Sequence, residues 1–83
     1  MKSVTVLYFA AVRELAGTAT EKLALPDHVQ TVQDFMLYLA EQRPALKGAL
    51  ASVRIARNES FAELHERLEE GDALALIPPV QGG

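Results

Sequence analysis

Apolar residues fall into short blocks along the chain, and three of these blocks have the composition of β-strands. Residues 2–9 are rich in β-branched and aromatic side chains, which suit a pleated sheet. Within them, residues 6–9 are almost continuously apolar, a pattern typical of a central strand with little exposure to solvent. Residues 20–25 form a second predicted strand. Residues 73–77 form a last, buried strand, which ends at Pro78 because proline cannot donate a hydrogen bond to a ladder.

The clearest helical pattern begins at Thr31. Thr31 and Asp34, three residues later, resemble a capping box in which the shorter Asp replaces the usual Glu. Arg43 and Pro44 end the helix, because the residue before a proline disfavours helical geometry. Apolar side chains lie at helical spacing along one face, and we expect this face to be core: Val32, Phe35, Met36, Leu39 and Ala40.

The remaining segments have weaker signals. Residues 10–16 are rich in helix formers, and Gly17 is placed to end a short helix there. We expect a helical turn over residues 45–51 and a strand with one solvent-exposed face over residues 53–57. Residues 60–69 are ambiguous. Ser60 and Glu63 fit a capping box and three apolar residues fit one helix face, so the local pattern favours a helix.

The order of these elements predicts the fold class. One long helix among several strands indicates an α+β fold, a mixed sheet packed on one side by that helix. The first and last strands should pair in its middle, which leaves the C-terminus to project from the edge of the sheet. Eighty-three residues form a single domain. We assign residues 1–77 to the domain and residues 78–83 to an extended tail.

Composition and charge exclude several classes of function. The chain has no cysteine, which removes disulfides, thiolate metal sites and cysteine nucleophiles. A net charge of −3 argues against binding nucleic acid. No apolar run approaches the length of a membrane span or of a secretory signal, so we expect a cytoplasmic protein without membrane contacts. His28 and His65 stand alone, and we predict no metal site.

The C-terminal tail carries the chemistry that the sequence offers. Gly82 and Gly83 have no side chains to obstruct a narrow channel. Pro78 and Pro79 favour an extended path, so the tail can reach roughly 15–20 Å from the domain. The α-carboxylate of Gly83, with an ordinary pKa of about 3.5, is a poor electrophile until it is activated, for example as an acyl-adenylate made elsewhere. The tail reads Pro78, Pro79, Val80, Gln81, Gly82 and Gly83.

Nothing else in the sequence looks catalytic, and no glycine-rich loop indicates an ATP site. Arg13 and Arg57 are candidate polar contacts to a partner, although a solvated surface charge is the simpler interpretation of each. The last third of the chain is acidic, which indicates a solvated surface, with an electrostatic docking patch as the sharper alternative. Its acidic residues are Glu59, Glu63, Glu66, Glu69, Glu70 and Asp72.

The chain resembles the ubiquitin-like sulfur-carrier subunits of molybdopterin synthase over essentially its whole length. The N-terminal match consists of VLYFA at residues 6–10 and VRELAG at residues 12–17. The specific part is the ending IPPVQGG, residues 77–83, since a bare Gly-Gly fits many ubiquitin-like proteins. Between them the match includes Asn58, Leu68, Gly71 and Asp72.

The resemblance implies a β-grasp fold and a mechanism. A ubiquitin-activating-type enzyme that uses ATP adenylates the carboxylate of Gly83, and a sulfur donor converts it to a thiocarboxylate. The tail then enters the large synthase subunit, in a heterotetramer of two carriers and two large subunits. There the sulfur passes to a cyclic pyranopterin precursor during molybdenum-cofactor synthesis. The chain would bind no cofactor, and alone it would not be catalytic, serving as the sulfur-donating subunit of a sulfurtransferase.

The resemblance also bears on the ambiguous segment, because the β-grasp sheet has a place for a short strand near residues 59–62, followed by a turn. We let the resemblance decide and predict that strand. Two positions depart from the family's habit, Arg57 in place of an apolar residue and Arg67 in place of a proline. Three alternatives stay open: a thiazole-pathway sulfur carrier, a ubiquitin-like modifier of lysines, and an interaction domain with an inert tail.

Overall fold

The two strands predicted to be most buried lie side by side at the centre of a single five-stranded sheet. In the computed structural model, which describes residues 1–79, the first and last strands pair in parallel, and the other three pair antiparallel to their neighbours. The strand order is β2-β1-β5-β3-β4. The strands are β1 (Lys2–Tyr8), β2 (Thr20–Leu25), β3 (Arg54–Arg57), β4 (Ser60–Phe61) and β5 (Ala73–Ile77).

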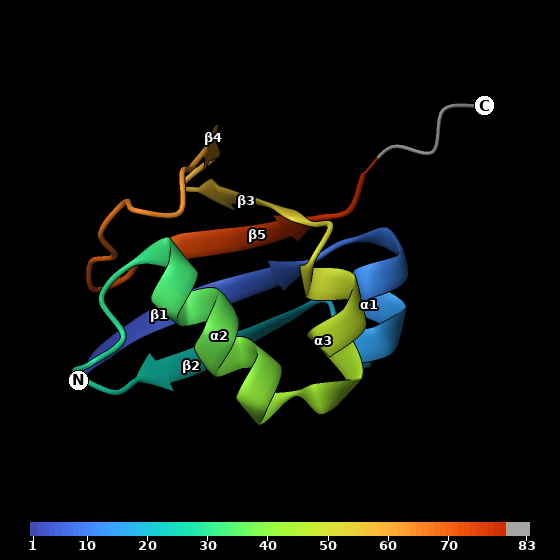
Figure 1. Ribbon diagram of the computed structural model, residues 1–83, viewed down its shortest axis with the longest axis horizontal. Helices are drawn as coiled ribbons and strands as arrows, with labels where there is room; N and C mark the ends of the chain where they lie inside the picture. Colours follow the sequence, from blue (N-terminus) through green and yellow to red (C-terminus); the bar gives the residue numbers. More distant parts are fainter. Residues whose placement is uncertain (80–83) are drawn as a thin grey trace.

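The helices cover one face of this sheet and leave the other open (Figure 1). They are α1 (Ala10–Ala16), α2 (Val32–Gln42), the 3₁₀ turn η1 (Pro44–Leu46) and α3 (Lys47–Leu50). The predicted α+β class, with a mixed sheet packed against one main helix, is therefore confirmed. The parallel central pair and the single long helix are the β-grasp arrangement that the resemblance implied.

The core forms between the helices and the alternate strand residues that point toward them. From α2, Val32, Phe35 and Leu39 are fully buried, as their helical spacing predicted. Burial of each such side chain contributes about 1.5–3 kcal/mol. The sheet and the other helices supply further buried side chains, among them Val4, Val6, Tyr8, Val12, Leu46, Ile55, Leu74 and Leu76.

Local capping signals set the bounds of the helices. The Thr31 hydroxyl accepts a hydrogen bond from the Asp34 N–H at 3.1 Å, and the Asp34 carboxylate accepts one from the Thr31 N–H at 3.2 Å. This is the predicted capping box. The Asp34 carboxylate also accepts from the Gln30 N–H at 3.0 Å, and the hydrogen bonds from the Gln30 and Thr31 N–H groups hold the pKa of Asp34 below its ordinary value. Gly17 ends α1 with φ of 77°, and its N–H donates to the Arg13 carbonyl.

The local pattern favoured a helix over residues 60–69, and this prediction is wrong. Only Ser60–Phe61 is regular there, as β4, and the strand predicted from the resemblance is confirmed. The following loop hydrogen-bonds to the start of α2, where the Glu66 and Leu64 carbonyls accept from the first two N–H groups of that helix. Because the loop satisfies donors that a helix N-terminus leaves free, tertiary pairing outweighs local helix propensity.

Pro78 and Pro79 follow β5 directly and leave the sheet at its end beside α1 (Figure 1). Residues 80–83 lie outside the described residues, so the predictions made for Val80, Gln81, Gly82 and Gly83 fall there as well. In the described part of the chain, no helix combines the length and the apolar character that crossing a membrane requires.

Candidate docking face and tail base

The open face of the sheet carries a row of apolar side chains that crosses four strands. Leu7 of β1 is in register with Ala75 of β5, which pairs with Ala56 of β3, which pairs in turn with Phe61 of β4. The four line one shallow hollow together with Phe9, Ala73, Ile77 and the carboxylate-bearing Glu59. Strand alternation produces the row, because on β1, β5 and β3 the residues that precede Leu7, Ala75 and Ala56 point to the core.

Two aromatic side chains on this face remain largely exposed. Phe9 is 48% exposed and Phe61 is 55% exposed. Aromatic rings are enriched at protein interfaces, where they supply a large contact area at little cost in conformational entropy. The two exposed rings make this face a candidate interaction site.

The base of the tail continues this apolar face. Pro78 and Pro79 line a second hollow together with Phe9, Ala10 and Ile77, and its surface is almost entirely apolar. Ala10 has φ of 51°, in the left-handed region, at the corner where β1 passes into α1. Of the predicted tail residues, these two prolines are the ones that the structure places, and they lie against the candidate docking face.

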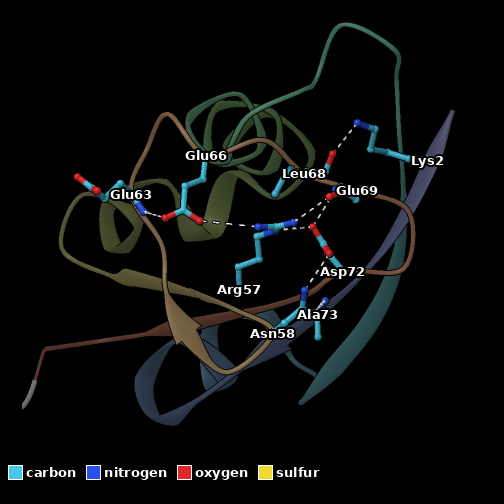
Figure 2. Close-up of polar contacts among 9 residues, drawn as sticks. All are labelled: Lys2, Arg57, Asn58, Glu63, Glu66, Leu68, Glu69, Asp72 and Ala73. Atoms are coloured by element: carbon cyan, nitrogen blue, oxygen red, sulfur yellow. Dashed lines mark hydrogen bonds and ion pairs between the residues drawn. The ribbon is translucent and has the colours of Figure 1, made fainter.

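Arg57 does not behave as a solvated charge. Its Nε lies 2.7 Å from the Asp72 carboxylate, and its guanidinium also lies 3.5 Å from Glu69 and 3.8 Å from Glu66 (Figure 2). The Asp72 side chain further accepts hydrogen bonds from the Asn58 amide and from the Glu69 N–H. The simpler interpretation of Arg57, a solvated charge, is therefore wrong. Arg13, in contrast, is exposed on α1.

Burial disfavours a charge on Asp72, which is 5% exposed. The hydrogen bonds from Arg57, Glu69 and Asn58 outweigh that cost and hold the pKa of Asp72 below its ordinary value. The same hydrogen bond to Asp72 raises the pKa of Arg57. The acidic stretch is thus only partly a solvated surface, because Asp72, Glu66 and Glu69 surround one arginine.

A second polar network, which sequence reasoning missed, lies on the helix side of the sheet. Arg43 binds Glu21 through two hydrogen bonds, of 2.6 and 2.8 Å, and the buried Tyr8 hydroxyl donates to the same carboxylate. The Arg43 pair holds the pKa of Glu21 below its ordinary value, while burial raises the pKa of Tyr8. The one available signal was the tyrosine in a buried strand, since a buried hydroxyl requires a partner.

The described residues contain no group of three or more His, Cys, Asp or Glu side chains that could hold a metal ion. His28 and His65 are both exposed and lie on separate segments. The predictions that the chain needs no metal and binds no cofactor stay predictions.

The fold defines a ubiquitin-like protein, and its open sheet face, which continues into Pro78 and Pro79, is a candidate docking surface. A family model described as "ThiS family" matches residues 6–83, and the chain belongs to this family. A molybdopterin synthase sulfur carrier subunit from Drosophila yakuba is 42% identical over 84 residues, covering 98% of this chain and 91% of the relative.

Solved structures similar to this chain include a molybdopterin converting factor subunit and a protein modifier. A putative molybdopterin converting factor, subunit 1, from Pyrococcus furiosus is 31% identical with a TM-score of 0.84, over 96% of this chain and 100% of the other. Small archaeal modifier protein 1 from Haloferax volcanii is 30% identical with the same TM-score of 0.84 and the same coverage, 96% and 100%. One fold therefore serves both sulfur carriers and protein modifiers among its relatives.

Proposed function

We propose that this chain is the sulfur carrier, and thus the small subunit, of a molybdopterin synthase. The observation that carries the proposal is the family match across residues 6–83, which includes the Gly-Gly terminus, together with sulfur-carrier relatives over nearly the full length. The apolar sheet face supports it, because a carrier must dock on another protein to deliver its terminus.

The proposed chemistry takes place at the carboxyl group of Gly83. A ubiquitin-activating-type enzyme uses ATP to form the glycyl adenylate and releases pyrophosphate. A nucleophilic sulfur from a donor, at the oxidation level of sulfide, then displaces AMP, so that a C–S bond forms as the C–O bond to AMP breaks. Activation is necessary because the free carboxylate is ionised at neutral pH and resists attack. The thiocarboxylate sulfur then attacks the cyclic pyranopterin precursor, and water cleaves the bond between that sulfur and the carbonyl carbon, which leaves the sulfur on the product and restores the carboxylate of Gly83.

The other residues of the chain hold and present that terminus. Phe9, Phe61 and Ile77 bind the partner, and Pro78 and Pro79 form the base of the tail beside them. In this proposal the docked partner is the large synthase subunit, in a heterotetramer of two carriers and two large subunits. The carrier contributes the sulfur but no catalytic side chain, and the assembly works in the cytoplasm.

The test is removal of the last two glycines. We expect the chain ending at Gln81 to lose all activity in a synthase reconstituted with the large subunit, the activating enzyme, ATP and a sulfur donor. Its free energy of unfolding should stay within about 0.5 kcal/mol of the full chain, because every identified core residue lies before the tail. Normal activity of the truncated chain would overturn the proposal.

Intact-mass measurement of the full chain provides the direct readout of the chemistry. After incubation with the activating enzyme, ATP and the sulfur donor, a fraction should carry one sulfur in place of one oxygen. If only the free carboxylate is ever found, the carrier function fails.

A modifier of lysine side chains is the second candidate, favoured by the likeness to small archaeal modifier protein 1. The same adenylate could react with a lysine amine and form an isopeptide bond. Adducts of Gly83 on lysines of other proteins, found by mass spectrometry after proteolysis, would support this role, and it could coexist with sulfur transfer. The third hypothesis is a sulfur carrier of the thiazole pathway. The Pro78-Pro79-Val80 sequence favours the molybdopterin synthase carrier over it.

A further inference from the structure

Arg54 lies at the edge of the apolar sheet face, at the end from which the tail leaves. Its backbone is in register with Ile77, the last residue of β5. Two residues along β3, Ala56 belongs to the apolar row, so alternation places the Arg54 side chain on the same face. Its guanidinium carbon stands 3.9 Å from the centroid of the Phe61 ring.

The charge of Arg54 has no carboxylate partner within residues 1–79, where no acidic oxygen comes within 4.0 Å of it. Arg57, three residues later on the same strand, is instead surrounded by three carboxylates. Glu63 lines a hollow together with Arg54, but its carboxylate oxygens are more than 4.0 Å from the guanidinium nitrogens. Glu59, which lines the apolar hollow, lies beyond the opposite end of β3. Arg57 is therefore paired with carboxylates of the fold, while Arg54 lies beside the candidate docking face without such a pair among the described residues.

Docking of a protein on this face would remove water from both Phe61 and Arg54. An unpaired buried charge costs several kcal/mol, which would offset much of the gain from burying the apolar row. The stacked guanidinium is already restricted in its motion, so forming a fork-like pair with a carboxylate loses little further entropy. A partner with a carboxylate at this position would pair with the Arg54 guanidinium, so the cost of burying an unpaired charge would be avoided and a specific contact would form.

We propose that Arg54 is a specificity-determining contact, and that the large synthase subunit places an Asp or Glu side chain against its guanidinium when it covers the apolar face. The inference rests on the proposed function, because it takes that subunit as the docked protein. Proteins that present a neutral or basic surface at this point are rejected, since they leave the arginine buried and unpaired.

The first experiment measures the affinity of the full chain for the large subunit by calorimetric titration at low and at high salt. R54E should weaken binding about 30-fold or more, and R54M about 5- to 10-fold with a shallower salt dependence. K47E is the matched control, since Lys47 is exposed on α3 and the charge change equals that of R54E. Its affinity should stay within about twofold of the unsubstituted chain at high salt.

Each outcome of the titration distinguishes this inference from the proposed function. Unchanged or tighter binding by R54M overturns the carboxylate contact while leaving the carrier function intact. No binding by the unsubstituted chain overturns the proposed function, and the inference with it. The other carboxylate to test as the partner of the Arg54 guanidinium is the chain's own C-terminal carboxylate. If the effect of R54E disappears in a chain whose Gly83 carboxylate is blocked as an amide, the contact is internal and the proposal is wrong.

A second experiment identifies the partner carboxylate directly. In R54K the side-chain amine keeps the charge, and a zero-length carbodiimide joins an amine to a carboxylate only where the two are in contact. Mass spectrometry of the cross-linked complex should find an amide between position 54 and an Asp or Glu of the large subunit. The same treatment of the unsubstituted chain is the control, because arginine does not form this amide. A complex that forms with R54K but lacks this amide overturns the proposal.

Discussion

The two-residue turn between β3 and β4 places consecutive side chains in the left-handed region of backbone space. Asn58 has φ of 52° and Glu59 has φ of 74°. Asparagine tolerates this region, and here its amide also accepts from the Ala73 N–H and donates to Asp72. Glutamate has no such compensation. The turn therefore keeps about 1 kcal/mol of strain at one residue beside the docking face.

Replacement of that glutamate should make the protein more stable. We expect E59G to raise the free energy of unfolding by about 0.5–1 kcal/mol, because glycine adopts positive φ without steric cost. The measurement is urea unfolding followed by circular dichroism. E63G is the matched control, since Glu63 is exposed and has no positive φ. It should be neutral or destabilising, and a gain of stability in E63G equal to that in E59G would contradict the strain argument.

At the scale of elements, the Arg57–Asp72 pair ties β3 to the loop that precedes β5 (Figure 2). That loop also pairs with the start of α2, so one network connects the sheet, the loop and the main helix. D72N should lower the free energy of unfolding at neutral pH by about 2–3 kcal/mol, because it leaves Arg57 without its closest counter-charge. E41Q, at an exposed position of α2, should change it by less than about 0.5 kcal/mol.

This pair also predicts how stability depends on pH. The pKa of Asp72 is lower in the folded than in the unfolded chain, so its stabilisation is complete above the unfolded value of about 3.9 and is lost as the pH falls further. Glu21 acts in the same direction through Arg43. Urea midpoints measured below pH 4 should fall steeply in the unsubstituted chain and less steeply in D72N. Equal slopes would contradict the assignment to Asp72.

At the scale of the whole molecule, one face of the sheet packs against the helices, and the opposite face is the one proposed for binding. The helices bury one side of the sheet, while Phe9 and Phe61 remain about half exposed on the other. This division allows the affinity for a partner to change without loss of the fold.

Serine substitutions on the open face should separate binding from stability. F61S and F9S should each weaken binding of the large subunit by about 10-fold or more, since buried aromatic anchors dominate interface energies. Their free energies of unfolding should fall by less than about 1 kcal/mol. L37S is the matched control, because Leu37 is 64% exposed but lies on α2, in the helical layer. Loss of binding in L37S equal to that in F61S would contradict the assigned face.

The sequence alone determined the elements whose signals are local. The strand Thr20–Leu25, the strand Ala73–Ile77 and the capping box at Thr31 were all predicted, since turn residues, proline and capping side chains act within a few positions. The α+β class followed from the order of these elements. The assignment of chemistry to the carboxyl group of Gly83 also came from sequence, and it stays a prediction because that residue lies outside the described part.

The tertiary structure decided whatever depends on partners far apart in the chain. It made β4 a strand rather than a helix because the loop after it satisfies the N-terminus of α2. It paired Arg57 with Asp72 and Arg43 with Glu21, contacts between residues 15 and 22 positions apart that no local spacing predicts. It also selected which apolar side chains stay exposed, since the face of a strand residue has meaning only once the helices cover one side of the sheet.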